Sequence, residues 1–307
     1  MQYRKLRGTD LKLSVLGMGC SSFWALKSTP EETAISLLQH AYDKGINFFD
    51  TGSSYADGNA ERRLGKFINS IERSSVVVST KAGTKQASMG NATKDFSPKA
   101  IRESVAESLE RLNTEYIDIL FLHSPKLDEL SSELFNEIEK LIDEGKIRFA
   151  GVHSSDKVVV DTVKSIDCFT VFLSDFNLTR ASFETTINDI ANLNKGFIAA
   201  TPLAQMLFTN KIFFPTSKKD FWYLARALKN RRKQLINSFK LRFASQLPNI
   251  PAEAVALNFA LDNKHVSSAI FGTTQHKNID KNIEALTFSI PQEVFNKIRR
   301  IKLPFRE

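Results

Sequence analysis

The sequence predicts an α/β fold, a (β/α)8 TIM barrel with an N-terminal β-hairpin and a long helical insertion after strand seven. Short apolar, β-branched segments alternate with longer segments of helical period, which indicates a parallel sheet with crossover helices. Eight such units occur, and eight close into a barrel. The chain has 307 residues, 42% hydrophobic and 25% charged, which is typical of a globular protein with a sizeable core. We expect one domain over residues 1–307, because α/β barrels of this size form a single domain.

The first predicted element is a hairpin over residues 3–13, with its turn at residues 7–10, which would close the bottom of the barrel. Strands are expected at residues 15–19, 47–50, 75–80, 117–123, 147–152, 169–174, 196–200 and 266–271. Helices are expected between them at residues 30–44, 59–70, 98–112, 131–144, 156–165 and 183–194. A doubly wound sheet is the structural alternative. It is weakened because no Gly-x-Gly-x-x-Gly motif opens a helix after an early strand.

Several predicted helix ends carry local signals. Ser97-Pro98 places a hydroxyl cap and then a proline at the start of the third helix, and Ser28-Thr29-Pro30 does the same for the first. Three helical patterns are followed by a glycine that precedes a strand, as a C′ glycine should. These glycines are Gly45, Gly145 and Gly196.

The insertion after the seventh strand is long and basic. About 65 residues separate Ala200 from Val266, with helices expected at 220–241 and 252–261, and long barrel insertions are usually functional. Residues 221–252 contain no Asp or Glu. Their seven basic residues are Arg226, Lys229, Arg231, Arg232, Lys233, Lys240 and Arg242. The net charge is +8, so 8 − 7 leaves +1 for the rest of the chain. This local excess suggests a nearby anion, but a solvated helix face is the preferred interpretation.

Composition and the lengths of the apolar runs also argue against several kinds of partner and cellular location. The two cysteines, Cys20 and Cys168, lie far apart without metal-ligand spacing, so we expect no disulfide framework, no metal site and a reducing cytoplasm. The first residues contain no apolar h-region, so no signal peptide is expected. No apolar run reaches the ~18 residues of a membrane span, and no nucleic-acid-binding module is recognisable. We therefore expect neither a membrane nor a nucleic-acid partner.

Four residues of complementary chemistry follow neighbouring strands. Asp50, Lys81 and His123 end or follow strands two, three and four, and Tyr55 lies in the loop just beyond Asp50. In a barrel, residues at these strand ends line the active site. Taken singly, they could be a turn cap, an exposed charge, a strand-end histidine and a packing aromatic. Their joint placement favours a catalytic site.

Proton transfer is the chemistry that these four residues would support. A free tyrosine has a pKa of ~10, too high for efficient proton transfer near neutrality. The Lys81 ammonium would favour the phenolate and so make Tyr55 a better acid. Asp50 would keep Lys81 charged and in place. His123 could hydrogen-bond the substrate oxygen and orient a carbonyl for hydride attack.

The same residues lie in segments that resemble the aldo-keto reductase family. Its second-strand signature resembles residues 49–61, FDTGSSYADGNAE, and its third and fourth strands resemble residues 78–81, VSTK, and 116–125, YIDILFLHSP. Its N-terminal hairpin, first strand and last unit are similar to residues 3–6, 16–20, 254–261 and 272–274. The resemblance covers nearly the whole chain. It implies an NAD(P)H-dependent oxidoreductase that interconverts a carbonyl and its alcohol, with Asp50, Tyr55, Lys81 and His123 as a catalytic tetrad.

The resemblance also implies a nicotinamide cofactor, with NADP(H) favoured and NAD(H) as the alternative. The residues that it assigns to the cofactor are Gly19, Cys20, Asp50, Ser154, Thr201, Pro202, Leu203, Gly272, Thr274, Asn278 and Asn282. A helix N-terminus after residues 272–274 would suit a phosphate. Lys277 or Lys281 would meet a 2′-phosphate.

This sequence departs from the family where the nicotinamide carboxamide is held. The family often has Gly-Val-Ser-Asn after strand five, and this chain has Gly151-Val152-His153-Ser154. A family glutamine after strand six is replaced by Leu173, for which Asp175 or Asn177 could compensate. A stacking aromatic after strand seven is replaced by Ala200. The candidates for the substrate side are Trp24, His153 and Trp222.

The function predicted from these features is that of an oxidoreductase acting on a small-molecule carbonyl, such as an aldehyde, a ketone or a sugar. The basic insertion suggests that the substrate is anionic. The alternative is a catalytically weak, nucleotide-binding regulatory or structural subunit on the same fold, because the carboxamide contacts are altered. A metal-dependent barrel hydrolase or lyase has little support, since the chain has five histidines and no ligand cluster.

Overall fold

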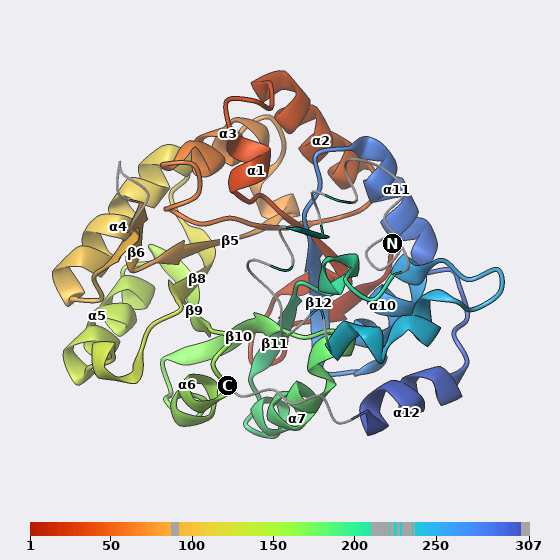
Figure 1. Ribbon diagram of the computed structural model, residues 1–307. Coiled ribbons are helices and arrows are strands. Elements are labelled where there is room, and N and C mark those ends of the chain that lie inside the picture. Colours follow the sequence, from red (N-terminus) through yellow and green to blue (C-terminus); the bar gives the residue numbers. More distant parts are fainter. Residues whose placement is uncertain are drawn as a thin grey trace.

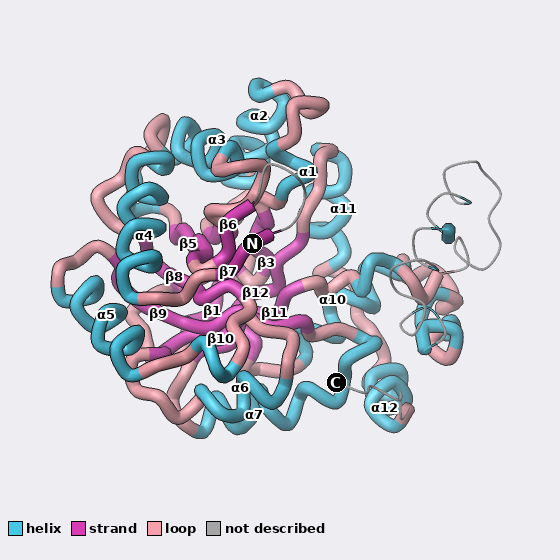
Figure 2. Tube along the Cα trace, turned by 60° about the vertical axis from the view of Figure 1, so that its left-hand side comes forward, coloured by secondary structure: helices cyan, strands magenta, loops and turns pink. Residues whose placement is uncertain are grey.

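The computed structural model describes residues 1–86, 92–209 and 237–301, together with residues 221, 224, 225, 228 and 235. Eight parallel strands form a closed barrel in the order β10-β11-β12-β3-β4-β5-β8-β9. Helices form an outer ring around these strands (Figures 1 and 2). The prediction of a (β/α)8 barrel is confirmed, and the doubly wound alternative is wrong.

The barrel strands agree with the predicted segments to within a few residues. They are β3 (Leu16–Gly19), β4 (Phe48–Asp50), β5 (Val77–Ala82), β8 (Ile117–His123), β9 (Ile147–His153), β10 (Phe169–Asp175), β11 (Gly196–Ala200) and β12 (Val266–Phe271). In the described part of the chain, two hairpins lie outside the barrel. The expected one pairs β1 (Tyr3–Lys5) with β2 (Lys12–Ser14), and an unpredicted one pairs β6 (Thr84–Gln86) with β7 (Ala92–Lys94).

The helices of the outer ring also follow the predicted order. They are α2 (Glu31–Asp43), α3 (Asn59–Ile68), α4 (Pro98–Leu112), α5 (Ser132–Asp143), α6 (Lys157–Val163), α7 (Glu184–Asn192) and α11 (His276–Ala285). Additional helices are α1 (Ser22–Ala25), α10 (Ala252–Asp262) and α12 (Gln292–Arg300). Of these three, α10 was expected. Most of the helix expected at 220–241 lies outside the described residues.

The predictions made from local signals at helix ends are confirmed in part. The Ser97 hydroxyl caps α4 by accepting from the Ala100 N–H at 3.3 Å. Helix α2 instead has Pro30 at its N-cap and no side-chain cap, so that expectation is corrected. Gly196 is the first residue of β11, and Asn194 takes the left-handed conformation after α7 with φ +58°. Asparagine can replace glycine there because it tolerates this conformation better than other side chains.

The barrel interior is filled by apolar side chains from the strands and the hairpin. The buried residues of this cluster are Leu6, Leu11, Leu13, Phe48, Val77, Ile119, Phe121, Val171, Leu173, Ile198 and Ile270. Leu6, Leu11 and Leu13 belong to the first hairpin, which therefore closes the bottom of the barrel as expected. Side chains alternate along a strand, so residues two positions beyond an interior residue also face inward. Asp50 follows Phe48 in this way, and His123 follows Phe121 at the carboxyl end of the barrel.

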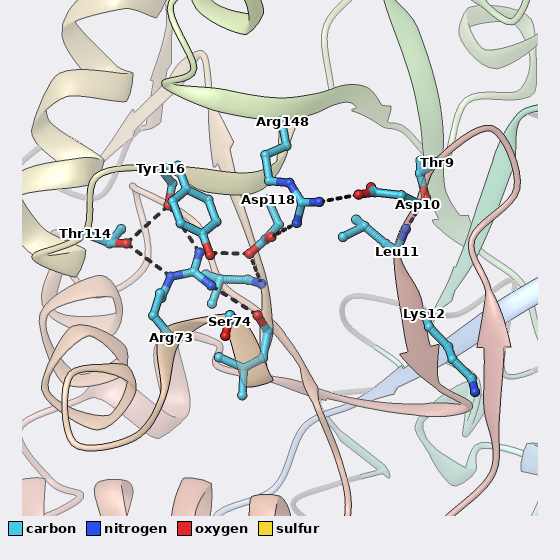
Figure 3. A network of polar contacts seen from close by, with 12 residues as sticks. Thr9, Asp10, Leu11, Lys12, Arg73, Ser74, Thr114, Tyr116, Asp118 and Arg148 are labelled. Atoms are coloured by element: carbon cyan, nitrogen blue, oxygen red, sulfur yellow. Dashed lines mark hydrogen bonds and ion pairs between the residues drawn. The ribbon is translucent and has the colours of Figure 1, made fainter.

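A charged network ties the first hairpin to the amino ends of three strands (Figure 3). Asp118, whose side chain is 1% exposed, accepts from Arg73 Nη2 at 2.8 Å and from Arg148 Nη1 at 2.7 Å. It also accepts from the backbone N–H of Val78 at 3.0 Å. Arg148 Nη2 in turn donates to Asp10 Oδ2 in the hairpin turn at 2.8 Å. Asp118 therefore connects β5, β8 and β9 with the turn below them.

Replacing Asp118 by asparagine should lower the free energy of unfolding by about 3 kcal/mol, because two guanidinium groups lose their shared buried carboxylate. Asp10→Asn is the matched control. Asp10 contacts the same Arg148 but is 70% exposed, and an exposed ion pair contributes less than about 1 kcal/mol. Urea unfolding of both variants measures the difference. Equal losses for the two variants would contradict this interpretation of the network.

Candidate active site

An ion pair inside the carboxyl end of the barrel organises the candidate site. Lys81 Nζ, on β5, donates to Asp50 Oδ2 at the end of β4 over 2.6 Å. It also donates to the Thr51 carbonyl oxygen at 2.6 Å, and Ser79 Oγ donates to Asp50 Oδ1 at 2.7 Å. The Lys81 side chain is 1% exposed. Both charged groups are thus fixed by two contacts each and are shielded from water.

Lys81 keeps its positive charge in this buried position. Burial by itself would lower the pKa of the ammonium, because it disfavours the charged form. The opposite charge of Asp50 and the interactions of Lys81 with Tyr55 act against burial, and the pKa of Lys81 is raised above its ordinary value. The site therefore holds a fixed cation at neutral pH.

Tyr55 comes from the loop between β4 and α3 and lies against this cation. Its backbone N–H donates to the Gly52 carbonyl oxygen at 2.9 Å, which closes a tight turn. A Cβ at Gly52 would lie 3.2 Å from the Tyr55 ring, so glycine allows the ring to fold back over the turn. Lys81 Nζ lies 5.1 Å from the centroid of the Tyr55 ring. The loop thus brings a phenol to the buried ammonium.

His123 completes the group at the end of β8. Its ring meets the Tyr55 ring edge-on, with centroids 5.9 Å apart. Burial, Lys81, His153 and Lys94 lower the pKa of His123 to about 3. The imidazole is therefore neutral near pH 7 and can donate or accept a hydrogen bond without carrying charge. The structure brings together all four residues that the sequence singled out for catalysis.

Most of the residues expected to hold a cofactor end β3 or β4 or follow β3, β9, β11 and β12, at the same end of the barrel, and Asn278 and Asn282 lie on α11. Cys20 and Ser154 are among those whose polar groups already bond the protein. Cys20 is fully buried and its N–H donates to the Asp50 carbonyl oxygen at 2.7 Å. Ser154 is 2% exposed, and its Oγ accepts from the Asp156 N–H at 3.1 Å. The Ser154 hydroxyl keeps its own proton for another acceptor.

Thr201 links Asp175 and Asn177, the two polar residues near the position of the family glutamine. Its Oγ1 donates to Asp175 Oδ1 at 2.8 Å, and Asn177 Nδ2 donates to its carbonyl oxygen at 3.0 Å. Ser155 Oγ donates to the other oxygen of Asp175 at 2.9 Å. Thr201 has φ +49°, and the chain continues through Pro202, which is buried, and the half-buried Leu203. Asp175 and Asn177 therefore brace the loop after β11.

The start of α11 offers a site for an anion. Gln275 is its N-cap residue and provides no side-chain cap, so backbone N–H groups remain available there. Gly272, Thr274, Lys277 and Lys281 are exposed around this end. By contrast, Asn278 Nδ2 donates to Thr273 Oγ1 at 2.9 Å and Asn282 is 5% exposed. These N–H groups and lysines fit a phosphate-bearing ligand.

Two tryptophans were expected on the substrate side. Trp24 is 1% exposed, and its indole N–H donates to the Ala34 carbonyl oxygen at 3.0 Å. This burial corrects the expectation, because the ring packs in the core between the barrel and its helices. Trp222 lies outside the described residues, as do five of the seven basic residues of the insertion.

Within the described ranges, no group of three or more histidine, cysteine, aspartate and glutamate residues could hold a metal ion. None of the helices in the described part of the chain combines the length and the apolar character needed to cross a membrane. One cleft at the opposite, amino end of the barrel has a volume of about 790 Å³. Arg7, Asp10 and Arg148 are among the residues that line it, and Lys81 lies at the other end of the strands.

The closed (β/α)8 barrel holds a buried Lys–Asp pair, a tyrosine and a neutral histidine at its carboxyl end, where enzymes of this fold have their active sites. Residues 15–302 match the model of the aldo/keto reductase family, and the chain belongs to that family. It is an NAD(P)H-dependent oxidoreductase acting on carbonyls or alcohols.

Relatives of the chain match it over nearly its whole length. An L-galactose dehydrogenase of Arabidopsis thaliana is 29% identical, over 100% of this chain and 96% of its own. A probable voltage-gated potassium channel subunit beta of the same plant is 29% identical, over 93% and 91%. The structure is similar to the holo form of an aldo-keto reductase from Bacillus halodurans, with a TM-score of 0.81 and 25% identity over 98% and 96% of the two chains.

Proposed function

We propose that this protein interconverts a sugar or other small carbonyl compound and its alcohol, with Tyr55 as general acid and base and NADP(H) as cofactor. The observation that carries the proposal is the buried Lys81–Asp50 pair, whose ammonium lies 5.1 Å from the centroid of the Tyr55 ring. A fixed cation beside a phenol stabilises the phenolate form, which eases transfer of its proton.

Each of the four residues has a distinct role in the proposed reaction. In reduction, Tyr55 donates its phenolic proton to the carbonyl oxygen, and in oxidation it takes a proton from the alcohol. Lys81 stabilises the resulting phenolate, and Asp50 keeps Lys81 charged and in place. His123, neutral and adjacent to Tyr55, hydrogen-bonds the same substrate oxygen and orients it. The bound nicotinamide supplies or accepts the hydride.

Residues around the proposed cofactor site favour NADP(H). The uncapped start of α11 and the exposed Gly272 and Thr274 would receive a phosphate. Lys277 and Lys281 are exposed nearby and would meet a 2′-phosphate. Ser154 would offer its hydroxyl proton to the carboxamide. NAD(H) is the alternative, since it shares every group except the 2′-phosphate.

A sugar is the proposed substrate class because the relative from Arabidopsis thaliana is named for L-galactose. An anionic group on that sugar, such as a phosphate, would be met by the basic run of residues 221–252. A catalytically weak regulatory subunit is the second candidate. It is favoured by the relative named as a probable channel subunit.

A panel of sugars, aldehydes, keto acids and polyols, assayed in both directions with NADPH and NADH, tests the proposal. We expect turnover of a sugar or aldehyde, with kcat/KM about tenfold higher for NADPH. Replacing Lys277 and Lys281 by alanine should remove this preference, because both lysines are exposed. An exposed ion pair contributes less than about 1 kcal/mol, and two such pairs together correspond to roughly tenfold. NADPH binding without turnover of any compound would instead support the regulatory subunit.

A further inference from the structure

Two histidines form a pair at the mouth of the barrel. Strands β8 and β9 run parallel, and their register sets His123 directly opposite His153. Side chains alternate along a strand, so both histidines project to the same side as the interior residues Phe121 and Phe149. The two imidazole rings stack with centroids 5.4 Å apart and planes 22° apart. The mouth therefore presents two imidazoles side by side.

His153 has a buried hydrogen-bonding atom with no partner among the described residues. Its Nδ1 is sheltered from solvent and makes no hydrogen bond to the described residues, while the side chain as a whole is half-buried. Native proteins keep few such atoms unpaired, because an unpaired buried polar group is destabilising. A bound molecule with a donor or acceptor at this point would relieve that cost.

The chemistry of the pair suits a neutral, polar group. Burial and the Lys81 ammonium lower the pKa of His153 to about 3, so this ring is uncharged near neutral pH, as is that of His123. A neutral imidazole has one N–H donor and one acceptor nitrogen. A hydroxyl group also donates and accepts, so it matches such a ring. A carboxylate would find no cation on either histidine.

We propose that His153 is a specificity-determining residue, an inference that rests on the proposed function. It hydrogen-bonds the substrate hydroxyl on the carbon adjacent to the reacting carbon. His123 lies against Tyr55 and faces the reacting oxygen. His153 lies one strand further and faces the oxygen on the adjacent carbon. Two rings 5.4 Å apart can each bind one of two neighbouring oxygens. The substrate class is a hydroxyaldehyde, a hydroxyketone or a vicinal diol.

Lactaldehyde and propanal provide the test, because they differ only in the hydroxyl next to the aldehyde carbon. His153→Phe keeps a planar ring against His123 and removes both ring nitrogens. We expect kcat/KM for lactaldehyde to fall about tenfold in this variant, since the substrate hydroxyl loses its partner. The value for propanal should change by less than about twofold, because propanal has no such hydroxyl.

Two further variants test whether the effect is specific to the side chain of His153. His153→Asn keeps an amide near the position of Nδ1 and should restore part of the preference for lactaldehyde. His265→Phe changes a histidine at the other end of the barrel, where its Nδ1 lies 3.3 Å from Arg7 Nη2, and should leave the preference unchanged. A His153→Phe variant with the wild-type preference would overturn the proposal. So would a wild type that uses both aldehydes equally or uses neither.

NADPH binding, measured by fluorescence, distinguishes a substrate-binding role of His153 from a cofactor-binding role. We expect His153→Phe to bind NADPH as tightly as the wild type does. A tenfold loss of affinity would assign His153 to the cofactor and overturn the proposal. Failure of the proposed function gives a different result, namely a Tyr55→Phe variant that still reduces both aldehydes. Failure of the His153 role alone leaves both reductions dependent on Tyr55.

Discussion

Replacing Tyr55 by phenylalanine should lower kcat by about 10²–10⁴-fold, the range for loss of a positioned proton donor. The variant removes only the phenolic oxygen. Its ring can still pack over Gly52 and meet the edge of His123, so the loop and the barrel should be unchanged. Steady-state kinetics with NADPH and the best carbonyl of the panel measure the loss. NADPH affinity, measured in parallel, should stay the same.

Tyr42→Phe is the matched control for this experiment. Tyr42 lies on α2, and its hydroxyl donates to Ser75 Oγ at 3.0 Å, away from the barrel mouth. It should retain the activity of the wild type. If Tyr55→Phe turned over every carbonyl as fast as the wild type, the proposed proton transfer would be wrong.

Lys81→Met should reduce both activity and stability. The variant leaves the Asp50 carboxylate, 7% exposed, without its counter-charge. Removing one partner of a buried ion pair typically lowers the free energy of unfolding by about 3–5 kcal/mol. Activity should fall by about 10²–10⁴-fold, because the Tyr55 phenolate loses the cation that stabilises it. Urea unfolding and steady-state kinetics measure the two effects separately.

The double variant Asp50→Asn with Lys81→Met distinguishes the structural role of Lys81 from its catalytic role. It contains no uncompensated buried charge, so much of the lost stability should return. Activity should stay low, because no ammonium lies beside Tyr55. A double variant that regains both stability and activity would show that Lys81 serves the fold alone.

The strand-end positions of the candidate site could be predicted because a barrel imposes a simple rule on them. β8, β11 and β12 begin and end where expected, and His123 is the last residue of β8. Asp50 ends β4, and Lys81 lies one residue before the end of β5. Alternation along each strand then turns these side chains into the mouth. The catalytic roles of these residues stay predictions.

Other features depend on contacts between distant segments. The β6–β7 hairpin has strands of three residues each, too short for an alternating pattern to reveal. Trp24 was expected near the substrate, but a hydrogen bond to the Ala34 carbonyl oxygen on α2 holds it in the core. The hairpin forms only when its two strands pair, and the position of Trp24 depends on helix α2. No local sequence pattern therefore indicates either feature.

The sequence by itself determined the barrel and the set of side chains that reach its mouth, because hydrophobic period and strand ends are local properties. Tertiary structure alone decided which of these side chains touch. The register of β8 against β9 stacks His153 on His123, and the spacing of β4 and β5 joins Lys81 to Asp50. Burial, which only the closed barrel provides, then keeps both histidines neutral, and the ion pair with Asp50 keeps the lysine charged beside Tyr55.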